Sequence, residues 1–443
     1  MTTLLFLLLV IAFVLIAIIR YEIHPFLALF GGAIGYGLLV GMDLKMILQS
    51  ITEGFGGVMG NVGLLILFGV ILGTFLEKTG GAMVIAEKVL SWVGEKSINL
   101  SLMLSGWVLS IPVFGDSTIL MMNPIAKSLS AKSSVSYAAT IVAVSLGAMI
   151  SHSLVPPTPG PIATAGILGA DLGLVILYGT FISLLALIPV HFFINRWVSR
   201  IPLRPTAVST TQEVSHQDRP KLVSSLLPIL SPLVLIFFAS IANYPSQPLG
   251  NGTLKDLISF LGSPVIALFI GALLSFTLPK KLDRKLLSAT GWLGEALVAA
   301  APVIFITGAG AIFGKMLQNS GIGSSVTTAL EGANWGLFLP FLLAFGLKCA
   351  QGSTTVAMIT TASIVAPLLS PLGLDTDILK VFTTLAIGAG ALAISHANDS
   401  AFWVVTQLSG MTTKQGNLSH SLGTLIASFS AMAVLYLISL IVV

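Results

Sequence analysis

The sequence places a single carboxylate, Asp116, within a long apolar stretch. No other charged residue occurs between positions 97 and 126, and polar groups follow Asp116 at near-helical spacing on Ser117, Thr118 and Asn123. A charge in an apolar segment is rarely retained without a function. We therefore predict that Asp116 binds a proton and that its three polar neighbours bind hydroxyls of a substrate. Helix capping at an interfacial break would use the same residue types.

A second carboxylate, Asp399, lies in a denser polar segment. His396, Asn398 and Ser400 accompany it, between apolar runs on either side. Histidine and aspartate side chains can both take up and release protons. We predict that Asp399 couples a proton to the function of the protein, with His396 as a further candidate, and that Asn398 and Ser400 bind substrate. Asp399 is preferred to Asp116 because its polar neighbours are denser.

A proline-rich break at positions 156–161 follows His152 in the first half of the chain. No continuous helix can contain these prolines, but a proline fits the first turn of a new helix. The free amides and the dipole at a helix N-terminus attract anions. We predict that His152, Thr158, Gly160 and Thr164 contribute to a substrate-binding site. An ordinary turn outside the membrane would contain the same residue types.

The run Gly352, Ser353, Thr354 and Thr355 has the composition of a second helix N-terminus. A glycine followed by hydroxyls is typical of a half-helix that begins inside a membrane transporter. All four residues are predicted to bind substrate, although a capped but inert helix start would contain them too. Lys348 precedes this run. Either it reaches the membrane surface or it pairs with a carboxylate, and both alternatives stay open.

Motifs of common enzymes and of ATP-driven pumps are absent from the sequence. It contains no P-loop and no HExxH, CxxC or GxSxG pattern. We therefore predict no catalytic residue, no metal site and no cofactor. The single cysteine, Cys349, excludes a disulfide within the chain.

The elements that carry these segments have the composition of membrane-spanning helices. Hydrophobic residues make up 55% of the 443 residues and charged residues 9%, with a mean hydropathy of +0.99, whereas soluble domains are about one-quarter charged. Charge-free stretches near or above the ~20 residues that cross a bilayer recur along the chain. They are Met1–Ile19, Gly54–Leu76, Ser133–Ala170, Leu172–Asn195, Leu222–Leu254, Leu257–Pro279 and Gln415–Val443. The prediction is an all-α polytopic membrane protein with roughly 10–14 transmembrane segments, some of them broken or re-entrant.

Several short motifs occur twice, about 240 positions apart. Ile150-Ser151-His152 recurs at positions 394–396, and the glycine spacing of positions 69–73 recurs at 310–314. Such a repeat in an apolar chain is typical of secondary transporters, in which two related halves enclose a site near the bilayer midplane. We therefore divide the chain into a first membrane repeat (1–197), a cytoplasmic basic linker (198–222) and a second membrane repeat (223–443).

The distribution of basic residues predicts how the halves are oriented. Arg196–Lys221 and Pro279–Lys285 concentrate the lysines and arginines and are expected in the cytoplasm. The loop between them, Tyr244–Asp256, then lies outside, whereas Arg20 places the matching loop of the first half inside. The two halves are therefore predicted to be inverted copies, with both termini outside. The net charge of +4 is explained by these loops, and no nucleic acid partner is expected.

The polar segments resemble the gluconate:proton symporter (gluconate permease) family, within a superfamily of ion transporters that includes anion symporters. The resemblance spans nearly the whole chain. Its motifs are Ile111–Phe114 running into Asp116, Ser151–Pro161, Gly352–Ala357, Ser395–Trp403 and Gly410–Gln415. The resemblance implies a multi-pass protein of the bacterial cytoplasmic (inner) membrane that carries sugar acids, or other small hydroxy- or amino-carboxylates, with protons.

The sequence thus predicts a secondary transporter that moves a small organic anion, such as the sugar acid gluconate, in symport with protons. The expected partners are this anion, protons and the lipid bilayer, with a homodimer as a candidate assembly. A cation/proton antiporter is an alternative because broken helices around two aspartates also suit sodium, but a dense carboxylate cluster is missing. An intramembrane enzyme is a second alternative, although Asp116 and Asp399 form no recognised catalytic motif.

Overall fold

The computed structural model of the chain describes residues 2–21, 23–94, 97–133, 135–205, 219–242, 252–321, 335–396 and 399–442. These residues form helices and their connections, without a strand. The prediction of an all-α membrane protein is confirmed.

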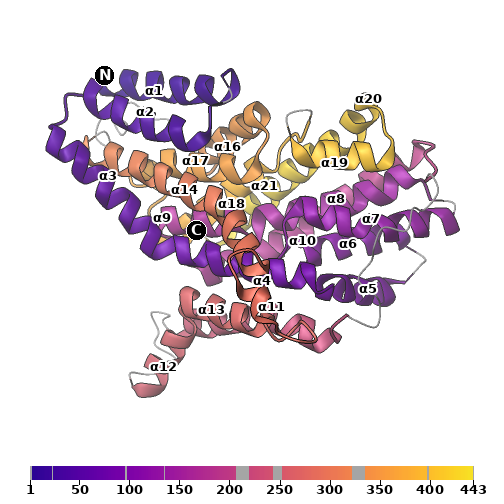
Figure 1. Cartoon of the computed structure of the whole chain (residues 1–443). Coiled ribbons are helices and arrows are strands. Elements are labelled where there is room, and N and C mark those ends of the chain that lie inside the picture. The colour runs from indigo at the N-terminus through magenta and orange to yellow at the C-terminus, as the bar shows by residue number, and fades with distance from the viewer. Residues whose placement is uncertain are drawn as a thin grey trace.

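The helices that the structure describes differ widely in length and pack against one another (Figure 1). In chain order the α-helices are α1 (Thr2–Ile19), α2 (Pro25–Leu39), α3 (Leu44–Val58), α4 (Leu64–Lys78), α5 (Gly81–Val93), α6 (Ile98–Leu109), α7 (Gly115–Lys132), α8 (Tyr137–Leu154), α9 (Pro159–Leu168), α10 (Leu172–Arg196), α11 (Leu222–Ala242), α12 (Thr253–Leu261), α13 (Pro264–Ser275), α14 (Trp292–Asn319), α16 (Phe338–Gln351), α17 (Thr354–Val365), α18 (Asp377–Ala391), α19 (Ser400–Ser409), α20 (Thr413–Gly416) and α21 (Leu422–Val442). Two π-helical turns, η1 (Met59–Gly63) and η7 (Asn417–Ser421), and three short 3₁₀ turns, η3 (Val198–Arg200), η5 (Arg284–Leu287) and η6 (Ala366–Leu368), complete the described elements.

Among the residues that the structure describes, five segments are long and apolar enough to cross a membrane without a sharp bend. They are Tyr137–Leu168, Leu172–Arg200, Leu222–Ala239, Arg284–Asn319 and Thr413–Val442. The pairs α4/α5, bent by 72°, and α12/α13, bent by 60°, raise the number to seven if each pair is one crossing. Other expected segments are apolar helices of 10–17 residues, because breaks divide the chain inside the apolar region.

The two halves of the chain interleave. Half-helix α9 of the first half packs against α17 and α18 of the second, and α19 of the second half packs against α7 and α8 of the first. The repeated motifs make α8 and α9 the counterparts of α18 and α19, so these contacts are reciprocal. Figure 1 shows the yellow α19 beside the magenta α7 and α8. This packing is what an internal twofold relation requires, whereas the inverted orientation of the halves stays a prediction.

Breaks in the helices bring helix ends into the centre of the molecule. The connection between α8 and α9 carries the prolines, and α17 begins directly after Gly352, which has a left-handed backbone with φ of 86°. Non-helical backbone at membrane depth is stable only where protein or water satisfies its polar groups. The breaks therefore lie between packed helices, where they position polar side chains away from lipid.

Two glycines allow α6 and α8 to pack closely. A Cβ atom added to Gly147 would lie 2.0 Å from the carbonyl oxygen of Met103, and one added to Gly106 would lie 2.3 Å from the carbonyl oxygen of Val144. Small residues at such crossings let the backbones of membrane helices approach one another. Since α8 leads directly into the proline break, this crossing fixes one wall of the region where the helices are interrupted.

Gly147→Ala should therefore destabilise the protein by ~1–3 kcal/mol, because the added methyl group must displace a backbone carbonyl. The measurement is the thermal midpoint of the detergent-solubilised protein, followed by tryptophan fluorescence. Gly35→Ala in α2 is the matched control, since its Cβ would meet no atom within 4 Å. The control should be neutral or slightly stabilising because alanine favours helix by about 1 kcal/mol. Equal midpoints for the two variants would contradict this account of the crossing.

The predicted inversion can be tested by single cysteines in a Cys349→Ser background. If both basic loops are cytoplasmic, cysteines at Arg204 and Lys281 should react with a membrane-impermeant thiol reagent only after the membrane is permeabilised. Cysteines at Leu254 and Val442 should react in intact cells. All four positions are exposed. Labelling of position 442 only after permeabilisation would rule out a C-terminus on the outer side.

Candidate functional site

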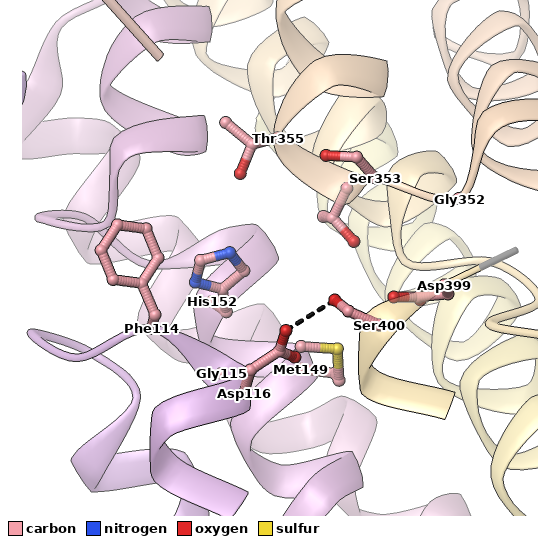
Figure 2. Close-up of a pocket in the computed structure, with 11 residues that line it drawn as sticks. Phe114, Gly115, Asp116, Met149, His152, Gly352, Ser353, Thr355, Asp399 and Ser400 are labelled. Atoms are coloured by element: carbon pink, nitrogen blue, oxygen red, sulfur yellow. Dashed lines mark hydrogen bonds between the residues drawn. The ribbon is translucent and has the colours of Figure 1, made fainter. Parts of the chain in front are cut away.

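A cavity of about 350 Å³ lies where the broken helices of the two halves meet. Figure 2 shows the side chains from the first half on one side of this cavity and those from the second half on the other. The lining residues are Phe114, Gly115, Asp116, Met149, His152, Gly352, Ser353, Thr354, Thr355, Asp399 and Ser400. Ligand pockets for small molecules have volumes of ≈ 300–1,000 Å³, so a small metabolite would fill this one.

The first turn of α17 faces the cavity. Gly352 ends α16 in a left-handed conformation that a residue with a Cβ would adopt only with strain, and its N–H donates to the carbonyl of Lys348. The Ser353 hydroxyl then caps α17 by accepting from the N–H of Val356 at 3.3 Å. Because the first amides of a helix carry a partial positive charge, this end of α17 can bind an anion.

His152 lines the same cavity from the first half of the chain. Its side chain comes from the last turn of α8, is 6% exposed and lines the cavity. Its Nδ1 atom has no hydrogen-bond partner among the residues that the structure describes. The Nδ1 atom itself is buried, and an unpaired polar atom in a buried site is unfavourable by about 1–3 kcal/mol.

Asp116 connects the two halves across the floor of the cavity. Its Oδ2 accepts a hydrogen bond of 2.6 Å from the Ser400 hydroxyl, as the dashed line in Figure 2 shows. Asp116 lies in the first turn of α7 and Ser400 begins α19, so the first turns of two helices meet at this contact. No lysine or arginine among the described residues forms an ion pair with Asp116.

Asp399, in contrast, forms a buried ion pair with Lys348. The distance between Lys348 Nζ and Asp399 Oδ2 is 2.5 Å, and the two side chains are 2% and 7% exposed. The ammonium also donates to the carbonyl of Gly352, and Asp399 Oδ1 accepts from the N–H of Ala401. Lys348 thus lies directly behind a wall of the cavity, since both of its acceptors line it. Of the two alternatives for Lys348, pairing with a carboxylate is the one observed.

Eight of the predicted site residues line the cavity, and seven others that the structure describes lie outside it. Ser117 is not among the residues that line the cavity, and Asn123 accepts from the Tyr137 hydroxyl. The Thr158 hydroxyl lies 3.0 Å from the His152 carbonyl oxygen and lines a separate, nearly closed space. His396 donates to the Cys349 carbonyl at 2.9 Å, and Gly160 packs against Thr355.

Two further predicted hydroxyls, on Thr118 and Thr164, are buried without a hydrogen-bond partner among the described residues. Asn398 lies outside the described residues. The roles that the sequence assigns to all of these side chains stay predictions.

Three lining residues escaped the sequence argument because they are apolar: Phe114, Gly115 and Met149. The only available signal was their adjacency to Asp116 and His152. Within the part of the chain that the structure describes, His, Cys, Asp and Glu side chains form no group of three that could hold a metal ion. The arrangement therefore offers anion binding, hydroxyl recognition and two carboxylates that can exchange protons.

Lys348→Met should destabilise the protein by about 3–5 kcal/mol, because it leaves the Asp399 carboxylate buried and unpaired. Adding Asp399→Asn to Lys348→Met should recover most of the loss. The control is Lys78→Met, which breaks the Lys78–Glu295 pair of the same 2.5 Å length but with side chains 39% and 50% exposed. Exposed pairs contribute ~0–1 kcal/mol. Unfolding midpoints in detergent would give these differences, and similar losses for Lys348→Met and Lys78→Met would contradict the assigned burial.

Comparison with known proteins places this site in context. A model of the GntP family of permeases matches residues 2–441. A gluconate permease of Pseudomonas aeruginosa is 32% identical over 437 residues, covering 96% of this chain and 95% of its own. The D-serine transporter DsdX of Escherichia coli K12 is 30% identical over 443 residues, covering 98% of both chains.

The fold is also found among solved structures. The crystal structure of the YdaH transporter of Alcanivorax borkumensis superposes with a TM-score of 0.63 over 89% of both chains. The identity is only 14%, so this similarity concerns the fold alone.

Proposed function

The chain belongs to the GntP family of permeases, and from this premise we propose that it carries a small hydroxylated carboxylate across the bacterial cytoplasmic membrane in symport with protons. Its relatives are permeases, and the chain is accordingly a membrane transporter and not an enzyme. The observation that carries the proposal is the cavity, in which a helix N-terminus, an unpaired imidazole nitrogen and two carboxylates converge.

The substrate class follows from the groups that line the cavity. The named relatives carry gluconate and D-serine, which share a carboxylate, a polar group on the next carbon and a hydroxyl on the carbon after that. The N-terminus of α17 can hold the carboxylate, and the His152 ring, which lines the cavity, can pair with the adjacent polar group. Thr355 and Ser400 offer hydroxyls on the cavity wall. A short hydroxy- or amino-hydroxy-carboxylate therefore fits, with gluconate as the leading sugar acid.

Lys348 provides a physical reason for coupling to protons. Its ammonium is held by the Asp399 carboxylate directly behind the cavity wall. If Asp399 binds a proton, the ammonium loses its counter-charge, and the substrate carboxylate at α17 can replace it. One lysine cannot neutralise two buried anions, the Asp399 carboxylate and the substrate carboxylate, at the same time. Protonation of Asp399 and binding of the substrate anion therefore favour each other. This competition for Lys348 would explain how a proton on Asp399 promotes substrate binding.

Asp116 is the second proton-binding candidate, and it differs from Asp399 in its partners. Asp116 accepts a hydrogen bond from the neutral Ser400 hydroxyl and faces the cavity. A substrate hydroxyl in the cavity can therefore donate to its carboxylate in place of a bound proton. We assign it the recognition of substrate hydroxyls together with Ser400, and keep its protonation as the alternative for the coupling step. The bilayer, the anion and protons are the partners of this scheme, and a homodimer remains a candidate assembly.

The proposal predicts that Asp399→Asn abolishes uphill accumulation. Asparagine keeps the shape of aspartate but cannot ionise, and it leaves Lys348 free for the anion, as protonated Asp399 would. The variant should still exchange substrate across vesicles without a pH gradient. The test uses purified protein in liposomes with radiolabelled D-gluconate and D-serine, and an imposed pH gradient of either sign.

Asp116→Asn is the matched control in the same assay. It should retain uphill accumulation, with weaker substrate binding by roughly 10- to 150-fold, the equivalent of one hydrogen bond to a charged group (~1.5–3 kcal/mol). If Asp399→Asn accumulates substrate with an unchanged pH dependence while Asp116→Asn does not, the proton carrier is Asp116. If wild-type protein accumulates neither acid under a proton gradient, proton symport of this substrate class is wrong.

A further inference from the structure

A second cavity, of about 310 Å³, lies apart from the one that Asp116 and His152 line. It lies between α3 and α14, which pack against each other (Figure 1), and it reaches the ends of the half-helices α9 and α17. Its lining includes Glu53, Gly57, Gly166, Ile167, Lys315 and Gln318. The volume is in the range of small-molecule pockets, so the second cavity can hold a metabolite as well.

The half-helices α9 and α17 extend from the first cavity to the second. Their starts lie together, where Gly160 packs against Thr355, and the second cavity is lined at the end of α9 and directly after α17. The 12 residues of α17 correspond to about 18 Å of helix between the two cavities. Helix α10 begins soon after α9 and ends at Arg196, so the end of α9 and the basic linker lie on opposite sides. With this linker in the cytoplasm, as the sequence predicts, the second cavity lies on the outer side of the first.

Lys315 and Glu53 line the second cavity as a partly exposed ion pair. The distance between Lys315 Nζ and Glu53 Oε2 is 3.2 Å, and the two side chains are 32% and 44% exposed. Glu53 Oε1 also accepts a hydrogen bond of 2.6 Å from the side-chain amide of Gln49. Because an exposed ion pair contributes only ~0–1 kcal/mol, a ligand carboxylate can take the place of Glu53 at Lys315 at little cost. Glu53 keeps its contact with Gln49 in that exchange.

The other lining groups complement a carboxylate that carries hydroxyls. Gly166 and Ile167 belong to the last turn of α9, where backbone carbonyls have no partner within the helix. Such a helix end carries a partial negative charge, so it accepts hydrogen bonds but does not attract a bare anion. Gln318 adds a side-chain amide from α14. One ammonium beside several acceptors therefore fits a molecule that has one carboxylate and several O–H or N–H donors.

We propose that the second cavity is an entry site for the transported hydroxy-carboxylate on the outer side of the membrane, an inference that rests on the proposed function. Lys315 parts from Glu53 and holds the carboxylate of the incoming substrate, while the end of α9 and Gln318 meet its hydroxyls. The substrate then moves along α17 to the first cavity. The dipole of α17 favours this step, because a carboxylate is more stable at the N-terminus of a helix than at its C-terminus. The entry site thus speeds the loading of the first cavity and leaves its equilibrium affinity unchanged.

The two members of the ion pair should act in opposite directions. The test measures kcat/KM for uptake of radiolabelled D-gluconate or D-serine, whichever wild type accumulates, into right-side-out membrane vesicles under a pH gradient. Lys315→Gln should lower kcat/KM about 10-fold, since a cation at a cavity mouth raises the arrival rate of anions by at least this factor. Glu53→Gln should raise kcat/KM, because it leaves Lys315 free for the substrate. A merely structural ion pair would give losses in both variants, and that result would overturn the entry site.

Filling the second cavity provides a test that keeps both charges in place. Gly57 lines the cavity, and a Cβ atom added to it would meet no described atom within 4 Å, so Gly57→Leu projects into the space without displacing its walls. Gly56 is the matched control, because its Cβ would be equally free and it is not among the lining residues. Gly57→Leu should lower kcat/KM, whereas Gly56→Leu should keep the wild-type value. Equal values of kcat/KM for the two leucine variants would overturn the entry site.

Equilibrium binding separates this inference from the proposed function. Lys315→Gln should bind substrate in detergent with the wild-type Kd, measured by calorimetry on the purified protein, whereas Asp116→Asn should bind more weakly. If wild-type vesicles accumulate neither D-gluconate nor D-serine, the proposed function fails, and the entry site with it. If wild type accumulates substrate and Lys315→Gln either keeps the wild-type kcat/KM or weakens the Kd as much as it lowers kcat/KM, only the entry site is overturned.

Discussion

The buried ion pair between Lys348 and Asp399 is the constraint on which the rest of the site depends. Removing two charges from water is unfavourable by several kcal/mol each, and only close contact with further hydrogen bonds offsets the loss. Here the Gly352 carbonyl and the Ala401 amide supply these bonds. Gly352 lies in the break before α17 and Ala401 in the first turn of α19, so the interrupted helices and the ion pair stabilise each other. Any event that neutralises one partner must change what the other binds.

This dependence explains why the half-helices meet where they do. A continuous helix has no free amides at its centre, whereas a helix that begins at the centre presents several. The starts of α7, α17 and α19 all lie at the cavity, and each brings a polar side chain, namely Asp116, Ser353 and Ser400. The free backbone amides at these helix starts therefore lie at the cavity, where a ligand can bind them. Membrane depth makes the arrangement specific, because lipid would satisfy none of these groups.

The sequence predicted the parts of this site that a charge or a break makes conspicuous. Asp116, His152 and Ser353 stood out because an apolar membrane segment has few reasons to contain them. The partner of Lys348 could not be predicted, since it lies 51 positions away and the contact depends on how α16 meets the second break. The proline context of Thr158 predicts that it binds substrate. The direction of its side chain depends on packing, and in the structure its hydroxyl donates to backbone carbonyls. Local pattern fixes which residues are available, and packing decides which of them meet.

The repeated glycine spacing lines two spaces of different size. Gly69 and Gly73 line a space of about 20 Å³, whereas Gly310 and Gly314 line one of about 310 Å³. The larger space lies at the C-terminal ends of α9 and α17, and the smaller one lies beside the prolines that precede α9. A carrier with one central cavity needs such inequality, because a path that is open on both sides would dissipate the gradient it uses.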